Sequence, residues 1–246
     1  MINYKIEHIQ EVSSTNSYLK DLLKETKAKE GTVILADFQS SGRGQGTSEW
    51  ISDRAENLTC SILLEPCLHV SQHFSLVEFI SLALLDTLGL FGIKSLIKWP
   101  NDMYVASKKI SGILIENVIA ENTISSSIVG VGLNVNQVIF PAALPNPVSM
   151  KLLLHQPMKR DEVFKEFLNR LNIRYDQLKK GSFNLLHYEY CENSMGLGRK
   201  IRYKKKGVLQ EGMLLRISEK GELFIEDEKG RLTGYLFGDV QILPSE

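Results

Sequence analysis

The pattern of the sequence changes around residues 191–198, and this change limits the folds open to the chain. Before it, apolar residues recur at both helical and strand spacings. After it come only short strands, separated by turn signals such as Lys220-Gly221 and Lys229-Gly230. A stretch of this kind is typical of a small β-barrel. We therefore expect an α+β fold, with one domain over residues 1–195 and an all-β domain over residues 196–246.

Period-two alternation and short apolar runs predict the strands, and helical spacing predicts the helices. The predicted strands span residues 4–10, 32–38, 58–64, 95–99, 103–105, 109–118 and 123–134, followed by 200–203, 209–217, 222–226 and 232–237. One helix follows the N-cap candidates at residues 13–16. A second runs from Ser71 to about Leu90, and a third from Asp161 to about Lys180.

The composition is that of an ordinary globular protein, with 43% hydrophobic and 24% charged residues. Lys plus Arg and Asp plus Glu both number 29, so a protein that coats nucleic acid is not expected. We find no signal peptide and no apolar run long enough to span a bilayer. The three cysteines fit no zinc spacing, so we expect reduced thiols in a cytoplasmic protein and no metal held by protein side chains.

The most informative motif is the segment 98–102, which reads Lys-Trp-Pro-Asn-Asp. Proline fixes its own φ and restricts the residue before it, so an extended or turn conformation is expected there. Lys108 and Lys109 follow, and they lead into an alternating strand that contains Gly112 and ends near Glu116. Two lysine sites beside Asn-Asp predict a site for an anion. Alone, the motif also fits a surface hairpin with solvated lysines.

Three other segments carry groups suited to ligand binding. Ser14-Thr15-Asn16 stands at a helix start, where hydroxyls and N–H groups bind polar ligands, although plain N-capping is the simpler interpretation. Residues 39–46 form a Gly-rich loop with one arginine, which fits either phosphate binding or a flexible connector. Residues 130–136 read Gly-Val-Gly-Leu-Asn-Val-Asn, where the small residues leave room for a ligand or simply weaken a strand.

Taken together, these four ordered segments resemble the biotin–protein ligases, also called biotin–[carboxyl carrier protein] ligases. The resemblance implies a mixed sheet flanked by helices, similar to the class II aminoacyl-tRNA synthetase fold, with an SH3-like C-terminal barrel. It also implies a two-step reaction. Biotin and ATP form biotinoyl-5′-AMP and pyrophosphate, and a lysine of a biotin carboxyl carrier protein then displaces AMP. Mg²⁺ is expected with the ATP, held mostly by phosphates and water.

The resemblance implies a role for each matching residue. Lys109 matches the family's catalytic lysine, which touches the biotin carboxylate and the α-phosphate, and Arg43 and Asp102 are expected to act with it. Asp102 is assigned mainly to orienting the acceptor lysine. Biotin and its adenylate are expected to contact Ser14, Thr15, Asn16, Gln39, Gly42, Arg43, Gly44, Gln45, Trp50, Lys109 and Gly112. The nucleotide is expected to contact Asn101, Asn134 and Trp50, which matches the tryptophan along the adenine.

The chain departs from the family pattern at the Gly-rich loop. Many members carry a second arginine two places after the first, where this chain has Gln45. Loss of one partly buried cation near a phosphate is expected to weaken retention of the adenylate by about 1–3 kcal/mol. The chain also begins almost at once with the catalytic segments, so we expect no DNA binding and no repressor activity.

Other interpretations stay open at this stage. A lipoate–protein ligase shares the related fold and the two-step logic, and a non-catalytic module that binds biotin or a nucleotide is the alternative from another class. The basic run 199–206 is expected to be mainly solvated, with a contact to ATP or to the acceptor as the alternative. No Ser-His-Asp or Cys-His pairing stands out, and all five histidines are predicted to be structural or exposed. We also expect a mobile Gly-rich loop without ligand, and a monomer or homodimer.

Overall fold

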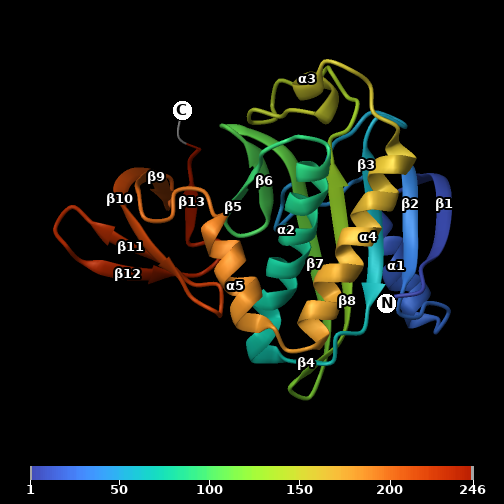
Figure 1. Cartoon of the computed structure of the whole chain (residues 1–246), viewed down its shortest axis with the longest axis horizontal. Coiled ribbons are helices and arrows are strands. Elements are labelled where there is room, and N and C mark those ends of the chain that lie inside the picture. The colour runs from blue at the N-terminus through green and yellow to red at the C-terminus, as the bar shows by residue number, and fades with distance from the viewer. Residues whose placement is uncertain (1, 245–246) are drawn as a thin grey trace.

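The computed structural model describes residues 2–244. A mixed sheet of eight strands forms the centre of the larger part (Figure 1). The order is β1-β2-β3-β8-β7-β6-β5, with β4 paired to β8; β1 and β2 run parallel and the other neighbours antiparallel. The strands are β1 Lys5–Val12, β2 Thr32–Gln39, β3 Leu58–Leu64, β4 Leu68–His69, β5 Leu96–Lys98, β6 Asp102–Val105, β7 Lys108–Ala120 and β8 Thr123–Leu133.

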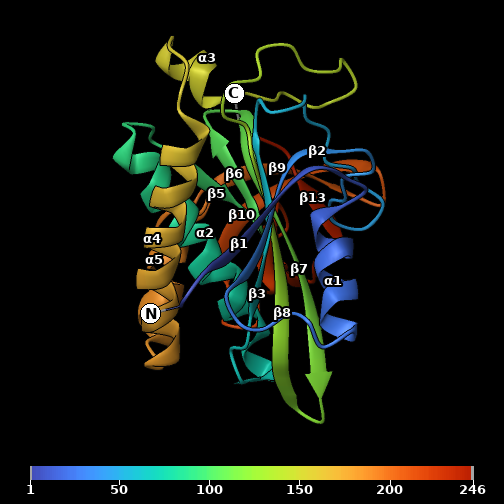
Figure 2. The same ribbon diagram turned by 90° about the vertical axis from the view of Figure 1, so that its right-hand side faces the viewer.

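Helices cover both faces of this sheet. Helix α1 lies on one face and α2 and α4 on the other (Figure 2). Side chains alternate along a strand, so neighbouring residues of β2 enter different cores. Ile34 packs with Leu19 of α1, whereas Val33 joins the larger core on the α2 side. The helices are α1 Thr15–Lys24, α2 His73–Leu90, α3 Met150–Leu154, α4 Arg160–Lys179 and α5 Phe183–Glu192, and a 3-10 turn, η1, spans Val70–Gln72.

Helix α2 is buried on nearly all sides between the sheet and helices α4 and α5. The segment Val70–Leu90 has the length and hydropathy of a membrane-crossing helix, which corrects the expectation that the chain has no such run. Here it occupies the position of a core helix, and its polar Ser81 and Thr87 are also buried.

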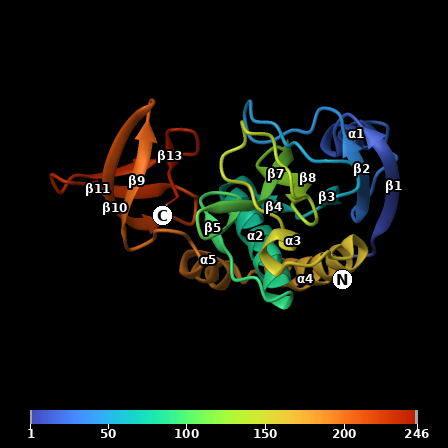
Figure 3. The same cartoon turned by 90° about the horizontal axis from the view of Figure 1, so that it is seen from above.

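The C-terminal part forms a separate five-stranded antiparallel sheet, of order β12-β11-β10-β9-β13. It stands beside the β5 edge of the main sheet, and α5 lies between the two parts (Figure 3). Trp99 joins them, because its Nε1 donates to the carbonyl of Gly221 at 3.0 Å and its ring lies against Phe237. The strands are β9 Lys200–Lys205, β10 Val208–Ile217, β11 Leu223–Asp227, β12 Leu232–Tyr235 and β13 Val240–Ile242.

The predicted fold class is confirmed: a mixed sheet flanked by helices, with a second antiparallel sheet at the C-terminal end. The two sheets fall on either side of residue 195, but they share one hydrophobic cluster, so the division into two domains stays a prediction. Sequence reasoning missed α3, α5, β4 and β13. Ser71 was predicted to cap α2, but it belongs to the preceding 3-10 turn, whose N-terminus is capped by His69, and Gln72 is the N-cap of α2.

Candidate active site

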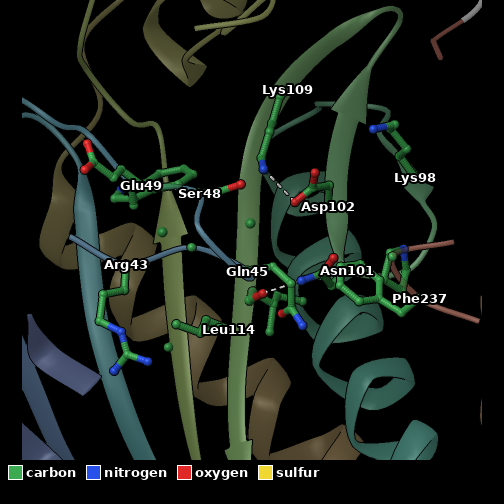
Figure 4. A pocket seen from close by; sticks show the side chains of 18 of the residues that line it. Arg43, Gln45, Ser48, Glu49, Lys98, Asn101, Asp102, Lys109, Leu114 and Phe237 are labelled. Carbon is green, nitrogen blue, oxygen red and sulfur yellow. Dashed lines mark hydrogen bonds and ion pairs between the residues drawn. The ribbon is translucent and has the colours of Figure 1, made fainter. Parts of the chain in front are cut away.

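A cavity of about 500 Å³ opens between strands β7 and β8, the Gly-rich loop and the C-terminal sheet (Figure 4). This volume lies within the usual range for small-molecule sites. All four segments singled out in the sequence reach it. The predicted site residues that line it are Ser14, Thr15, Asn16, Gln39, Arg43, Gly44, Gln45, Trp50, Asn101, Asp102, Lys109 and Gly112.

Lys109 and Asp102 form an ion pair on adjacent strands at the cavity wall. Lys109 Nζ lies 2.7 Å from Asp102 Oδ1, and their side chains are only 30% and 21% exposed. The register of β6 on β7 sets Asp102 opposite Gly112, after a bulge between Met103 and Tyr104. A Cβ at Gly112 would stand 3.2 Å from Asp102 Oδ1 and 3.3 Å from Lys109 Nζ, so glycine leaves this pair open to the cavity.

The turn before β6 is held tightly and brings a second lysine to the cavity. The peptide bond between Trp99 and Pro100 is cis, and Asn101 Nδ2 donates to the carbonyl of Ile113 at 2.5 Å. Lys98 also lines the cavity, with Asp102 between it and Lys109 in Figure 4. Burial lowers the pKa of Lys98, and the nearby Lys109 lowers it further against the opposing effect of Asp102. The sequence marked Lys98 as a cation, but it was not among the predicted site residues.

Two glycines of β8 let side chains rest directly on the sheet. A Cβ at Gly130 would overlap the amide of Asn16, and a Cβ at Gly132 would overlap the indole ring of Trp50. Trp50 therefore packs flat against β8, where its buried Nε1 has no hydrogen-bond partner among residues 2–244. The small residues at 130 and 132 thus make room for protein side chains of the site, whereas the sequence interpretation had a ligand or another backbone there.

The start of α1 is organised by bonds between side chains and backbone. Ser14 is the N-cap residue, yet its side chain makes no capping hydrogen bond. Gln39 Oε1 instead accepts from the backbone N–H and the hydroxyl of Thr15, at 2.8 and 3.0 Å. Ser61 Oγ lies 2.7 Å from Thr15 Oγ1 and 2.6 Å from Asn16 Oδ1. Ser61 is buried on β3, and sequence reasoning missed it because only the fold brings it here.

Arg43 is held by a carboxylate at the opposite end of the site from Lys109. Its Nη1 and Nη2 donate to the two oxygens of Glu116, both at 3.2 Å, in a forked pair. Asn16 Nδ2 donates to the same carboxylate at 2.9 Å. Burial alone would raise the pKa of Glu116, but the hydrogen bonds from Asn16 and Arg43 lower it. The guanidinium consequently points away from the pair of Lys109 and Asp102 (Figure 4).

Two predicted site residues do not line the cavity. Asn134 is buried, and its Nδ2 donates to the carbonyl of Val148 at 3.0 Å, so it holds the chain that follows β8 instead of facing the cavity. Gly42 supports the loop, because its carbonyl accepts from the Trp50 N–H at 2.9 Å and a Cβ there would overlap the Trp50 carbonyl oxygen.

The C-terminal sheet supplies cavity residues that were not predicted as site residues. They include Lys204, Lys206 and residues 237–242, which end in β13. Ser48 and Glu49, which follow the Gly-rich loop, also line the cavity. The basic run 199–206 is thus divided between two environments. Lys204 and Lys206 reach the cavity, whereas Lys200 pairs with Glu211 at 2.6 Å outside it. The run itself was the only sequence signal for these lysines.

Comparisons with known proteins show which proteins the chain is similar to. The chain is 29% identical to the bifunctional ligase/repressor BirA of Bacillus subtilis, over 89% of this chain and 68% of that protein. It is 27% identical to the biotin–[acetyl-CoA-carboxylase] ligase of Paracoccus denitrificans, over 89% of this chain and 95% of that protein. Among solved structures, the biotin protein ligase of Aquifex aeolicus in complex with biotin and ATP superposes with a TM-score of 0.81, at 28% identity, over 98% of this chain and 99% of that one.

The family model for biotin/lipoate A/B protein ligases matches residues 9–134, which is more than half of the chain. The matched span contains the start of α1, the Gly-rich loop, the turn at residues 98–102 and the strand that carries Lys109. These elements line the cavity together with residues of the C-terminal sheet. The chain belongs to the biotin/lipoate A/B protein ligase family.

Proposed function

We propose that this protein is an ATP-dependent biotin–protein ligase. It activates biotin as biotinoyl-5′-AMP and transfers the biotinoyl group to a lysine of a biotin carboxyl carrier protein. One observation carries the proposal: the ion pair of Lys109 and Asp102 faces a single cavity together with Trp50 and the start of α1. The similarity over nearly the whole chain to an enzyme solved with biotin and ATP supports it.

The first step needs positive charge around the reacting atoms. A biotin carboxylate oxygen attacks the α-phosphorus of ATP, and pyrophosphate leaves with its bonding electrons. Carboxylate and phosphate repel each other, so preorganised cations lower the barrier. Lys109 is assigned the position between the two anions, because its ammonium is a compact charge that can contact both. Lys98, Lys204 and Lys206 are assigned to the triphosphate, since they line the same cavity.

The second step needs an oriented neutral amine. The acceptor lysine attacks the carbonyl carbon of the mixed anhydride, AMP leaves, and the amine gives up a proton. Asp102 is assigned to orient this amine, because its carboxylate is fixed at the cavity wall by Lys109. Lys109 contacts its Oδ1, so its second oxygen, Oδ2, is assigned to accept from the incoming amine.

The two ends of the cavity suit the two halves of the adenylate. Ser14, Thr15, Asn16 and Gln39 form a polar, well-bonded end for biotin. Trp50 presents an aromatic face for adenine at the β8 side. Arg43 is proposed to exchange Glu116 for the adenylate when the loop folds over the ligand. Gly42 and Asn134 are assigned supporting roles, because neither lines the cavity.

Mg²⁺ is proposed to enter with ATP, where it would neutralise phosphate charge. Asp102 and Asn101 offer the oxygen ligands that Mg²⁺ prefers, which fits a metal carried by phosphates and water. Within residues 2–244 no group of three or more His, Cys, Asp or Glu side chains is arranged to hold a metal by itself.

The test is a turnover assay with purified protein, ATP, Mg²⁺ and biotin, with and without a biotin carboxyl carrier domain. We expect biotin-dependent pyrophosphate release, and a mass increase of the carrier by one biotinoyl group. Lipoate in place of biotin separates the two activities of the family. Greater activity with lipoate would replace the proposal by a lipoate–protein ligase, and calorimetric binding of biotin without turnover would replace it by a binding module.

A further inference from the structure

Outside the cavity, the structure brings together a cysteine, a histidine and a carboxylate. His187 and Cys191 lie one turn apart on α5, and Glu78 comes from α2, which packs beside it (Figure 1). His187 Nδ1 lies 2.6 Å from Glu78 Oε1, and His187 Nε2 lies 3.6 Å from Cys191 Sγ. Sequence reasoning did not single out this Cys-His contact, and it predicted His187 to be structural or exposed.

The order of these three groups is that of an activated nucleophile. The imidazole stands between a thiol and a carboxylate, and each ring nitrogen faces one of them. In such an arrangement the histidine can stabilise a thiolate while the carboxylate orients the ring. It does not form a chelate for a metal, because both ring nitrogens are occupied by these contacts.

Charge in the cluster favours a protonated ring. The hydrogen bonds with Cys191 and then with Glu78 raise the pKa of His187 to about 10. Burial raises the pKa of Glu78, and the bond from His187 opposes this. An imidazolium satisfies both neighbours at once, since it donates to the carboxylate and to the sulfur. A cation beside a cysteine also stabilises negative charge on the sulfur when it attacks.

Cys191 also borders the protein surface. Cys191 is partly exposed and lines a cleft of about 570 Å³ between α5 and the end of β10. The cleft is lined by charged groups of both signs, among them Arg216, Glu219 and Lys220. This mixed charge favours no single sign of ligand. A small molecule of either charge can therefore enter the cleft that Cys191 lines.

We propose that Cys191 is a nucleophilic thiol, activated by His187 and Glu78, that undergoes exchange with small organic disulfides. The thiolate sulfur attacks one sulfur of the disulfide, a new S–S bond forms, and the old S–S bond breaks. The imidazolium of His187 stabilises the attacking thiolate, and the leaving thiolate takes up the proton that Cys191 loses. Cys191–SH and RSSR thus give Cys191–SSR and RSH, with no other oxidant.

The other two cysteines serve as controls within the same molecule. Cys67 is exposed, and Cys60 is fully buried, where burial raises the pKa of its thiol to about 12. Under native conditions Cys67 gives the rate of an ordinary surface thiol. Cys60 reacts only when the protein unfolds, so its protection shows that a variant is still folded.

The experiment follows each cysteine separately by peptide mass spectrometry during reaction with a neutral small disulfide, with iodoacetamide as a second probe. At pH 7 an ordinary thiol is only a few per cent ionised, which leaves room for a large rate increase on activation. Thiolates of lower pKa are weaker nucleophiles, which reduces this increase. We therefore expect Cys191 to react about tenfold faster than Cys67. The Cys67 rate should fall about tenfold per pH unit below pH 8, whereas the Cys191 rate should fall much less.

His187→Gln and Glu78→Gln test the activation. His187→Gln should bring the Cys191 rate and its pH profile to those of Cys67, while Cys60 stays protected. The groups facing His187 are Glu78 from α2 and Cys191 from α5. Glu219 lies near Glu78 but does not contact the ring, so Glu219→Gln controls for a general effect of charge on the Cys191 rate. A Cys191 rate no higher than that of Cys67, or one unchanged by His187→Gln, would overturn the proposal.

Helix α5 also supports the turn that carries Asp102, which links Cys191 to the cavity. Tyr190 Oη donates to the carbonyl of Pro100 at 2.6 Å, and the N–H of Ile97 donates to the carbonyl of Asn193 at 2.8 Å. Provided that the proposed ligase activity holds, a mixed disulfide at Cys191 should slow pyrophosphate release several-fold. A reductant should reverse this, and Cys191→Ser should be insensitive. Unchanged turnover of the modified protein would refute the link, whereas the thiol rates above do not depend on ligase activity.

Discussion

Lys109 is the residue whose loss should be most informative, because its ammonium is the cation fixed closest to the proposed reaction. Lys109→Ala removes the positive charge 2.7 Å from Asp102 and leaves that carboxylate in the cavity without its partner. Removing one preorganised group that stabilises transition-state charge costs about 2.7–4 kcal/mol, or about 100- to 1,000-fold in rate. We therefore expect the first-order rate of adenylate formation to fall by that factor.

The fold should survive the same change. Both side chains of the pair are partly exposed, at 30% and 21%, and such pairs contribute about 1 kcal/mol or less to the free energy of unfolding. Thermal unfolding should accordingly show a small shift in Tm. A large loss of stability would mean that any loss of activity reports on folding and not on chemistry.

The assay is single-turnover formation of the adenylate with enzyme in excess over biotin. Lys108→Ala is the matched control, because it removes a lysine from the adjacent, exposed position of the same strand. Lys108→Ala should retain the wild-type rate. If Lys109→Ala kept more than a tenth of that rate, or if both variants lost the same factor, the assignment of Lys109 would be refuted.

Three further variants address the loop and β8. Gly132→Ala places a methyl group where the Trp50 ring lies. Because Trp50 is assigned to adenine, KM for ATP should rise far more than KM for biotin in steady-state assays. Equal rises of the two KM values would contradict this assignment. Glu116→Gln removes the charge that holds Arg43, so amide hydrogen exchange in the loop should become faster. Because the Arg43 side chain is 45% exposed, the free energy of unfolding should change by about 1 kcal/mol or less. Unchanged exchange would show that the pair does not restrain the loop. Gln45→Arg should slow release of the adenylate by about 5- to 150-fold, equivalent to about 1–3 kcal/mol, in a chase of labelled intermediate with unlabelled ligand. An unchanged release rate would show that Gln45 does not weaken retention of the adenylate.

The sequence predicted the elements whose side-chain pattern is strong. Strand β3 is a short run of apolar and small residues between turn signals, and its predicted ends agree with the structure. Helix α4 has buried residues at helical spacing, and its predicted ends differ from the observed ones by one residue. Helix α5 was missed because it buries fully only Leu186 and Tyr190, too few apolar positions to show a period.

Within the site, sequence order identified residues but not the direction of their side chains. Arg43 was correctly placed in a loop at the cavity, yet the forked pair with Glu116 depends on how that loop crosses β7. Asn134 carries the same amide whether it faces a ligand or the backbone of Val148, and only the path of the chain after β8 decides between the two. Direction is a property of tertiary packing, so a motif match cannot supply it.

The cluster at Cys191 shows the same limit most clearly. His187 and Cys191 are four residues apart, but this spacing brings them together only on a helix, and the sequence did not predict that helix. Glu78 is 109 residues from His187 and meets it because α2 packs against α5. A buried carboxylate is costly without a partner, so its 1% exposure is explained by the imidazolium that it faces. His187 is both the partner that accounts for the burial of Glu78 and the group that prepares Cys191 to react. Its position therefore does not separate its structural role from its chemical role, and only the thiol rates distinguish them.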